Sequence, residues 1–166
     1  MIIGMRGHDF GRMEPRALAL AIREAGFEAT QLAFAKAFPA PAEQYMTPGA
    51  LSEIRSAFAG IVLPVMGCYV SASDRDPDVL AEAKARFKRS LSASVILGAG
   101  CVGTETTHFT FPESEREAAY ARLLDFTREV CAHAEQVHAL VGIEPVALHT
   151  LNTPELTRRL IADVNS

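Results

Sequence analysis

Short apolar runs alternate with longer amphipathic segments along the whole chain. Such runs are typical of buried strands, and the segments between them are typical of helices that pack one face against a sheet. The apolar runs are residues 2–5, 29–34, 61–71, 94–100 and 141–149. The amphipathic segments are residues 14–30, 47–60, 76–94, 112–141 and 152–165. The pattern therefore predicts a strand followed by a helix, five times over.

Three of the predicted helices begin with a capping residue directly before a proline. Thr47 precedes Pro48, Asp76 precedes Pro77, and the sequence Asn-Thr-Pro at 152–154 repeats this start. Side-chain oxygens cap the first turn of a helix, and proline fits its first position. Strands that alternate with helices of this length predict an α/β fold with parallel strands joined by right-handed crossovers.

Composition narrows the classes of function. The 166 residues are enough for one domain, which we expect to span residues 1–166. A net charge of −4 offers no basic field for nucleic acid or for a membrane surface, so neither is expected as a partner. No segment is typical of a signal peptide or a membrane span, and the cytoplasm is the expected compartment. The three widely spaced cysteines fit neither a disulfide framework nor a zinc site.

Polar residues gather after the predicted strands. His8 follows the first predicted strand, and Cys68 lies toward the end of the third. Residues 104–108 follow the fourth strand, and Glu144 and His149 lie at the fifth. In parallel α/β folds, ligands bind at the carboxyl ends of the strands. The sequence therefore predicts a binding site at this edge of the sheet.

Glu144 is the most distinctive of these residues. The apolar run around it predicts a buried strand, and burying an ionised carboxylate without a partner is costly. At a strand end, Glu144 could bind a divalent metal or act as a general acid or base. The alternative is a salt bridge to a neighbouring strand or loop.

The other candidates would contact substrate. Thr104 and Glu105 offer a hydroxyl and a carboxylate for the hydroxyl groups of a sugar, although a solvated loop is the alternative. His8 could orient a substrate oxygen or lie in a surface turn. His149 could pair with Glu144, with substrate or with a phosphate, or simply precede a helix. Cys68 is grouped with them because it also follows a strand.

Nucleotide-binding and hydrolase motifs are absent. No GxGxxG motif follows the first strand, and there is no GxxxxGK[ST], GxSxG or HExxH motif. Residues 98–103, GAGCVG, resemble a dinucleotide-binding loop only loosely, because a polar segment and not a helix comes next.

Three segments carry a resemblance to a known family. Residues 19–34, 95–106 and, most specifically, 141–166 resemble the sugar phosphate isomerase/epimerase group, the xylose isomerase-like TIM barrels. The resemblance implies TIM-barrel-like (β/α) repeats, with this chain covering about five units of an eight-unit barrel. A full barrel needs roughly 250 residues. We therefore expect the front portion of a barrel, either truncated or completed by another chain.

The resemblance also implies a chemistry. In this family the glutamate that ends the fifth strand, here Glu144, binds a divalent metal such as Mn²⁺, Mg²⁺, Co²⁺ or Zn²⁺ and takes part in proton transfer. His8, Glu105 and His149 would line the same mouth. The other expected ligands come from strands beyond the fifth, which have no positions here, and a lone carboxylate does not hold a metal tightly.

Three functions remain open from the sequence. The first is a sugar or sugar phosphate isomerase or epimerase that is active once the barrel is completed. The second is a truncated, non-catalytic protein that binds a sugar or assembles with others. The third is an apurinic endonuclease-like activity, against which the acidic net charge argues, since the basic residues 84–90 lie on a predicted outer helix. For any of them, exposed sheet edges predict a homo-oligomer or a companion chain that covers those edges.

Overall fold

The chain folds into five parallel strands that alternate with helices. The computed structural model describes residues 1–166. The strands are β1 (Gly4–Arg6), β2 (Ala29–Gln31), β3 (Val65–Gly67), β4 (Cys101–Glu105) and β5 (Val141–Glu144). The helices are α1 (Pro15–Glu24), α2 (Phe34–Ala37), α3 (Pro48–Ala57), α4 (Pro77–Leu97), α5 (Arg116–Val137) and α6 (Pro154–Val164). Three short 3₁₀ helices, η1 (Gly7–Phe10), η2 (Ala42–Tyr45) and η3 (Glu113–Glu115), complete the connections.

The strands follow one another in chain order. β1 pairs with β2, and β3, β4 and β5 form a second ladder, all in parallel. Isolated bridges from β2 to the β3 region join the two ladders. The join is irregular because Pro64 has no N–H to continue the ladder that Val62 begins with Thr30. The predicted α/β class with parallel strands is confirmed.

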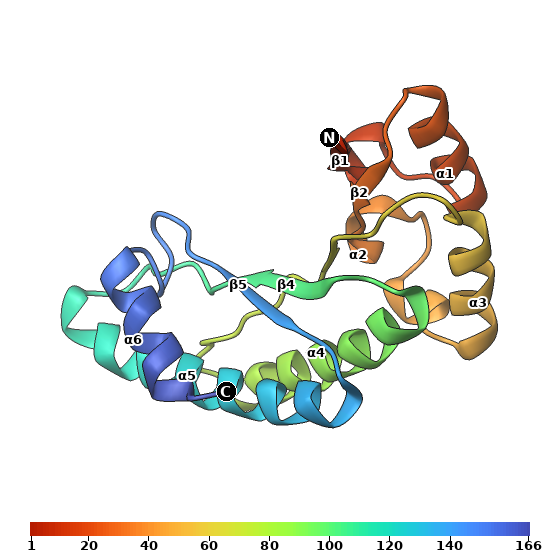
Figure 1. Cartoon of the computed structure of the whole chain (residues 1–166). Coiled ribbons are helices and arrows are strands. Elements are labelled where there is room, and N and C mark those ends of the chain that lie inside the picture. The colour runs from red at the N-terminus through yellow and green to blue at the C-terminus, as the bar shows by residue number, and fades with distance from the viewer.

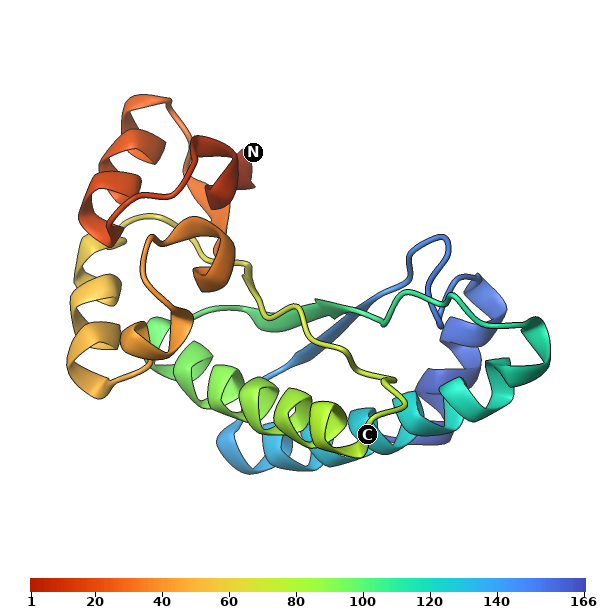
Figure 2. The ribbon, with the colours of Figure 1, turned by 180° about the vertical axis from the view of Figure 1, so that it is seen from behind.

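The five units lie along an arc, with helices on its outer side. Figure 1 and Figure 2 show α1 and α3 outside β1 and β2, and α4 and α5 running along β4 and β5. The inner side of β4 and β5 carries no helix, and only the short α2 lies inward of α3 beside β2. One face of the sheet is therefore covered by helices, and the other face is open.

The hydrophobic core fills the space between the strands and the helices. Phe87 of α4 and Phe126 of α5 are fully buried, and their rings meet edge to face with centroids 5.6 Å apart. β4 contributes Val102 to this core, whereas Cys101 and Gly103 on the opposite face are only half-buried. Alternate residues of a strand point to opposite faces, so a single strand separates the core from the open side.

The fourth strand lies later in the chain than predicted. Residues 94–97, which we expected in a strand, form the last turn of α4, and β4 begins at Cys101 in the segment predicted as a polar loop. Ser90, Ser94 and Leu97 extend the buried stripe of α4 at helical spacing. The helix ends at Gly98, whose φ of 71° is left-handed. A short apolar run does not distinguish a helix end from a strand.

The predicted helix starts are confirmed. Thr47, Asp76 and Thr153 each accept a hydrogen bond from a backbone N–H of the first turn of α3, α4 and α6. These bonds satisfy donors that have no partner inside the helix. None of the helices combines the length and the apolar character that crossing a membrane requires.

Candidate functional site at the carboxyl ends of the strands

Strand pairing brings two carboxylates side by side. Glu105 at the end of β4 pairs in register with Glu144 at the end of β5. Paired residues of neighbouring strands share one face, and the strands lie about 4.8 Å apart. Neither carboxylate takes part in a salt bridge. This pair is the centre of the candidate site.

Glu144 is exposed, contrary to the burial that its apolar neighbours suggested. β5 is an edge strand that ends at Glu144, and the residues from Pro145 onwards leave the sheet. Water therefore solvates the carboxylate, and no buried partner is needed. An exposed carboxylate without a partner is free to interact with a ligand.

Beside the carboxylates the open face of the sheet is bare backbone. Gly67 of β3 pairs with Gly103 of β4, which pairs with Gly142 of β5, two residues before Glu144. A Cβ at Gly103 would lie 3.0 Å from a methyl group of Val65, so this glycine allows a close approach. The three glycines form a row without side chains, next to the polar groups.

A tyrosine that sequence reasoning missed lies on the same face. A Cβ at Gly67 would lie 3.1 Å from the ring atom Cε2 of Tyr69, so the ring folds back over this glycine. Gln31 Nε2 donates a hydrogen bond of 2.8 Å to Tyr69 Oη. Lys36 Nζ lies 3.6 Å from the ring centroid. The only signal in the sequence was the position of Tyr69, two residues after Gly67 and so on the same face of an extended segment.

The electrostatics link Tyr69 to the carboxylate pair. Burial raises the pKa of the Tyr69 phenol above its usual value, and the hydrogen bond from Gln31 opposes this shift. The negative charges of Glu105 and Glu144 raise the pKa further. The phenol is therefore neutral at pH 7 and lies within electrostatic range of both carboxylates.

His8 lies in η1, directly after β1. Its Nδ1 atom is buried and has no hydrogen-bond partner. Burial lowers the pKa of the imidazole, the positive charge of Lys36 lowers it further, and Asp9 opposes the shift. His8 is therefore mainly neutral at pH 7, at the carboxyl end of β1. The structure thus places it near Lys36 but not in contact with Glu144.

His149 lies beyond β5, where two loops meet. Its ring packs edge to face with that of His108, with centroids 5.6 Å apart, and the two residues form an isolated antiparallel bridge. Its Nδ1 atom is buried without a partner, and its carbonyl oxygen accepts a hydrogen bond from Arg116. No hydrogen bond joins His149 to Glu144, so the pairing suggested by their spacing is not formed.

Cys68 and Thr104 lie on the helix-covered face. Cys68 is buried beside Ser90 of α4, and burial raises the pKa of its thiol. Thr104 is also buried, and its hydroxyl accepts from the Val70 N–H and donates to the Glu105 carbonyl. Neither side chain is on the face that carries the carboxylate pair. Their predicted contact with substrate stays a prediction that this geometry does not favour.

The residues present do not fit a complete divalent metal site. No group of three or more His, Cys, Asp or Glu side chains is arranged to hold a metal ion. Such an ion needs several ligands in a fixed geometry. Glu105 and Glu144 supply two carboxylates, so further ligands would have to come from elsewhere.

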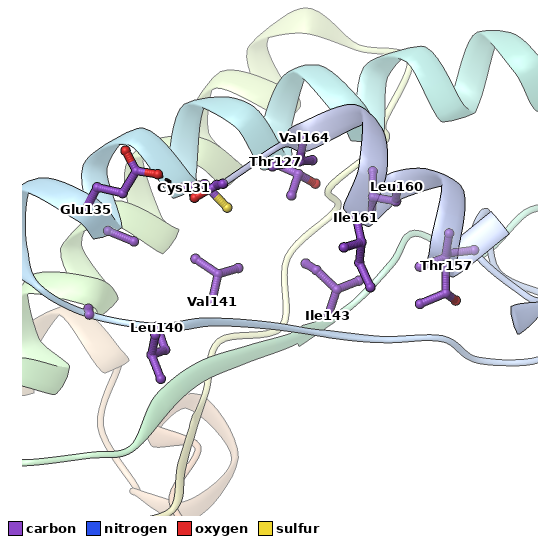
Figure 3. Close-up of a pocket in the computed structure, with 14 residues that line it drawn as sticks. Thr127, Cys131, Glu135, Leu140, Val141, Ile143, Thr157, Leu160, Ile161 and Val164 are labelled. Carbon is purple, nitrogen blue, oxygen red and sulfur yellow. Dashed lines mark hydrogen bonds between the residues drawn. The ribbon is translucent and has the colours of Figure 1, made fainter. Parts of the chain in front are cut away.

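An apolar groove lies on the other side of β5. It has a volume of about 380 Å³ between β5, α5 and α6, and Figure 3 shows Val141 on the side of Cys131 and Ile143 beside Ile161. The groove is distinct from the carboxylate pair, which lies on the opposite face. It adjoins the free edge of β5, which pairs only with β4. The groove is therefore a gap in the packing of the helix layer and not the candidate site.

The two lysines in the basic segment of α4 are paired with carboxylates of α5. Lys84 forms ion pairs with Asp125 and Glu129 of α5, and Lys88 also pairs with Glu129. Lysines that are already paired contribute little attraction for phosphates. The expectation that nucleic acid is not a partner stays a prediction.

The architecture and the site together define a class of protein. Parallel strands in chain order, each followed by an outer helix, with polar groups at the carboxyl ends of the strands, are part of a (β/α) barrel. The sequence profile of the xylose isomerase-like TIM barrels matches residues 19–166. The chain belongs to this family, and the predicted resemblance is confirmed.

Solved structures share this fold over part of their length. The 3-keto-D-glucoside 4-epimerase of E. coli aligns with a TM-score of 0.81 at 16% identity, over 99% of this chain and 65% of that one. The IOLI protein with a bound zinc atom aligns with a TM-score of 0.78 at 18% identity, over 100% and 60%. D-psicose 3-epimerase in the presence of D-fructose aligns with a TM-score of 0.78 at 20% identity, over 100% and 61%.

This chain spans about three fifths of the length of these structures, and the low identities show the fold alone. The expected partial barrel of about five units is confirmed. No curated protein sequence matches the chain.

Proposed function

We propose that this chain carries part of the site of an isomerase or epimerase that acts on a small sugar or sugar phosphate. The observation that supports this most directly is the pairing of Glu105 with Glu144 at the carboxyl ends of adjacent strands. Two epimerases of sugars are among the proteins that share its fold. His8 and His149 are proposed to line the same mouth, at the ends of β1 and β5.

The chemistry that suits Glu144 is proton transfer beside a carbonyl group. A carboxylate takes the proton from the neighbouring carbon, and the electron pair of that C–H bond forms a carbon–carbon double bond. The carbonyl π electrons move to oxygen, which gives an enediolate. Delivery of a proton to the opposite face, by a second acid that the completed barrel would supply, inverts the carbon. Delivery of a proton to the former carbonyl carbon, together with transfer of the hydroxyl proton of the neighbouring carbon to the former carbonyl oxygen, moves the carbonyl group. In the proposal Glu144 is this base, and Glu105 binds a sugar hydroxyl.

A divalent ion would stabilise the negative oxygen of the enediolate. The relative with bound zinc supports this part of the proposal, with Glu144 as one ligand and Mn²⁺, Mg²⁺, Co²⁺ or Zn²⁺ as the ion. Because this chain has no group of three ligands, the ion requires a completed barrel. The same observation favours the second candidate function, a non-catalytic sugar-binding or assembly protein.

Hydrogen exchange on a sugar separates the two functions. We would incubate the chain with D-fructose in D₂O, with and without the diamagnetic ion Mg²⁺, and follow the protons beside the carbonyl by NMR. An isomerase or epimerase is expected to exchange these protons for deuterium, and Glu144→Gln is expected to abolish the exchange. Glu155→Gln removes an exposed carboxylate on α6 and serves as the matched control.

Each outcome decides between the candidates. Chemical-shift changes of the protein on addition of D-fructose, without deuterium in the sugar whether or not the metal ion is present, would show binding without catalysis by this chain alone, which is the second candidate. Exchange that is equally fast with Glu144→Gln would contradict the assignment of Glu144 as the base. The expected location in the cytoplasm stays a prediction.

We also propose that a second copy or a companion chain covers the free edge of β5. Leu140 and Ile161 are 68% and 67% exposed and line the apolar groove, and contiguous exposed apolar surface commonly marks an interface. An unpaired strand edge also offers free N–H and C=O groups to another strand. Light scattering tests this, because a stable monomer of 17.9 kDa at low concentration contradicts it. Ile161→Glu is expected to weaken the association.

A further inference from the structure

We infer that Tyr69 binds the sugar, donating its hydroxyl hydrogen to a sugar oxygen on the β2 side of the carboxylate pair. This inference rests on the proposed function and adds a specificity residue to it. Residues from five elements lie at this end of the sheet. Gln31 ends β2, Lys36 lies in α2 and Tyr69 follows β3, while Glu105 and Glu144 end β4 and β5. None of the candidate residues from the sequence occupies the β2–β3 side of this face.

The ring of Tyr69 is held in one place. Gln31 fixes the phenol oxygen with a hydrogen bond of 2.8 Å, and the ammonium group of Lys36 lies 3.6 Å from the ring centroid. A cation at this distance is attracted to the electron-rich ring face. Gly67 leaves room for the ring, since any Cβ there would lie 3.1 Å from it. A side chain held by three neighbours loses little further freedom when it binds a ligand.

The hydroxyl group of Tyr69 still has a hydrogen to donate. A phenol can accept and donate at once. Its oxygen accepts from Gln31 Nε2, and no acceptor in the protein receives its own hydrogen. The neutral phenol thus presents a free donor, while Glu105 and Glu144 present acceptors.

Sugars match this arrangement. A small sugar carries hydroxyl groups that both donate and accept, and a ketose adds a carbonyl oxygen that only accepts. The row of Gly67, Gly103 and Gly142 adds no side chain of its own to the face that carries the phenol and the carboxylates. One sugar could therefore accept from Tyr69 at one end and donate to Glu105 at the other.

The test compares two tyrosine variants of the full chain. Tyr69→Phe removes the free hydroxyl and keeps the ring. Tyr45→Phe removes a hydroxyl that accepts only a long hydrogen bond of 3.4 Å from the Ala40 N–H, and keeps the ring that packs against Phe34 and Phe38, so it serves as the matched control. D-fructose is titrated into the wild-type chain and both variants, and the dissociation constants come from amide chemical shifts. Thermal unfolding of each variant shows whether the fold is kept.

A lost hydrogen bond predicts that Tyr69→Phe binds D-fructose about threefold to tenfold more weakly, while Tyr45→Phe binds like the wild type. Both variants are expected to unfold near the wild-type temperature.

If the wild type binds D-fructose and Tyr69→Phe binds it equally well, the inference is wrong and the proposed function stands. If the wild type binds no D-fructose, the proposed function fails for this sugar and the inference fails with it. If Tyr69→Phe unfolds at a clearly lower temperature than the wild type, Gln31→Leu replaces it as the test. Gln31→Leu removes the hydrogen bond that fixes the phenol oxygen, and unchanged binding of D-fructose by this variant would contradict the inference.

Discussion

The two faces of β4 carry different chemistry. Val102 and Thr104 point toward the helices and are almost fully buried, whereas Gly103 and Glu105 point toward the open side. The buried face contributes to stability through apolar contacts and satisfied hydrogen bonds. The open face offers bare backbone and an unpaired carboxylate. Because successive residues alternate between the faces, neighbouring positions can serve stability and binding separately.

The largest effect is expected on the helix side. Phe126→Ala removes a fully buried ring that packs against Phe87, so the free energy of unfolding should fall by about 3–5 kcal/mol. Urea denaturation followed by circular dichroism measures this change. Cys101→Ala, on the open face of β4, is the control and should cost less than about 1 kcal/mol. Equal losses for the two variants would contradict the division between the faces.

The next effect tests a polar contact in the helix layer. Tyr120 donates a hydrogen bond of 2.6 Å to Asp163, and burial together with this carboxylate raises the pKa of Tyr120 to about 12. An unfolded tyrosine has a pKa of about 10. The folded state therefore holds this proton more tightly, and the stability it contributes is complete below pH 10 and is lost as the pH rises toward 12.

Tyr120→Phe should lower the free energy of unfolding by about 1.5–3 kcal/mol at pH 7, since the bond has a charged acceptor. The variant should also lose less stability than the wild type between about pH 10 and 12. Denaturation at a series of pH values measures both changes. The same alkaline slope in both proteins would show that Tyr120 does not titrate as described.

Adjacent residues of β4 allow a smaller, more direct test. Thr104→Val removes a buried hydroxyl that bonds two backbone groups, and it should cost about 1–2 kcal/mol without changing sugar binding. Glu105→Gln should change stability by less than about 0.5 kcal/mol and should weaken binding of D-fructose. A larger loss of stability for Glu105→Gln than for Thr104→Val would reverse the assignment of the faces.

The smallest change in stability is expected at Gly142. Its φ is not positive, and an added Cβ would meet Cys101 Sγ at 3.5 Å, an ordinary contact. Gly142→Ala should therefore leave stability unchanged or raise it by less than about 1 kcal/mol, and should weaken binding by filling the glycine row. Gly49→Ala in α3, where a Cβ meets nothing within 4 Å, is the control for the backbone effect. Unchanged binding of D-fructose by Gly142→Ala would show that the row does not contact the sugar.

Much of the fold could be predicted because it is specified locally. The caps at Thr47, Asp76 and Thr153 and the alternation of apolar runs with amphipathic helices gave the order of elements. Residues 94–97 were misassigned because the last turn of α4 is as apolar as a strand. The position of Glu144 at the end of a strand was also predictable, because Pro145 directly follows it.

The composition of the candidate site was less predictable, because it depends on which face each residue takes. Cys68, Thr104 and Glu105 all lie at or directly after the end of a strand, but Cys68 and Thr104 point to the helix side. A shift of one residue moves a side chain to the other face of a sheet, and a sequence does not fix strand ends to that accuracy. Tyr69 was missed for the same reason, together with its contact to Gln31 from another strand.

The sequence by itself determined a repeated β-α pattern, the helix starts and a carboxylate at the end of the fifth strand, since each depends on neighbours within a few residues. Only the tertiary structure placed Glu105 beside Glu144, aligned Gly67, Gly103 and Gly142 in one row, and brought Tyr69 onto their face. These relations depend on the register between strands that lie some 35 residues or more apart in the chain, which long-range packing and hydrogen bonding decide.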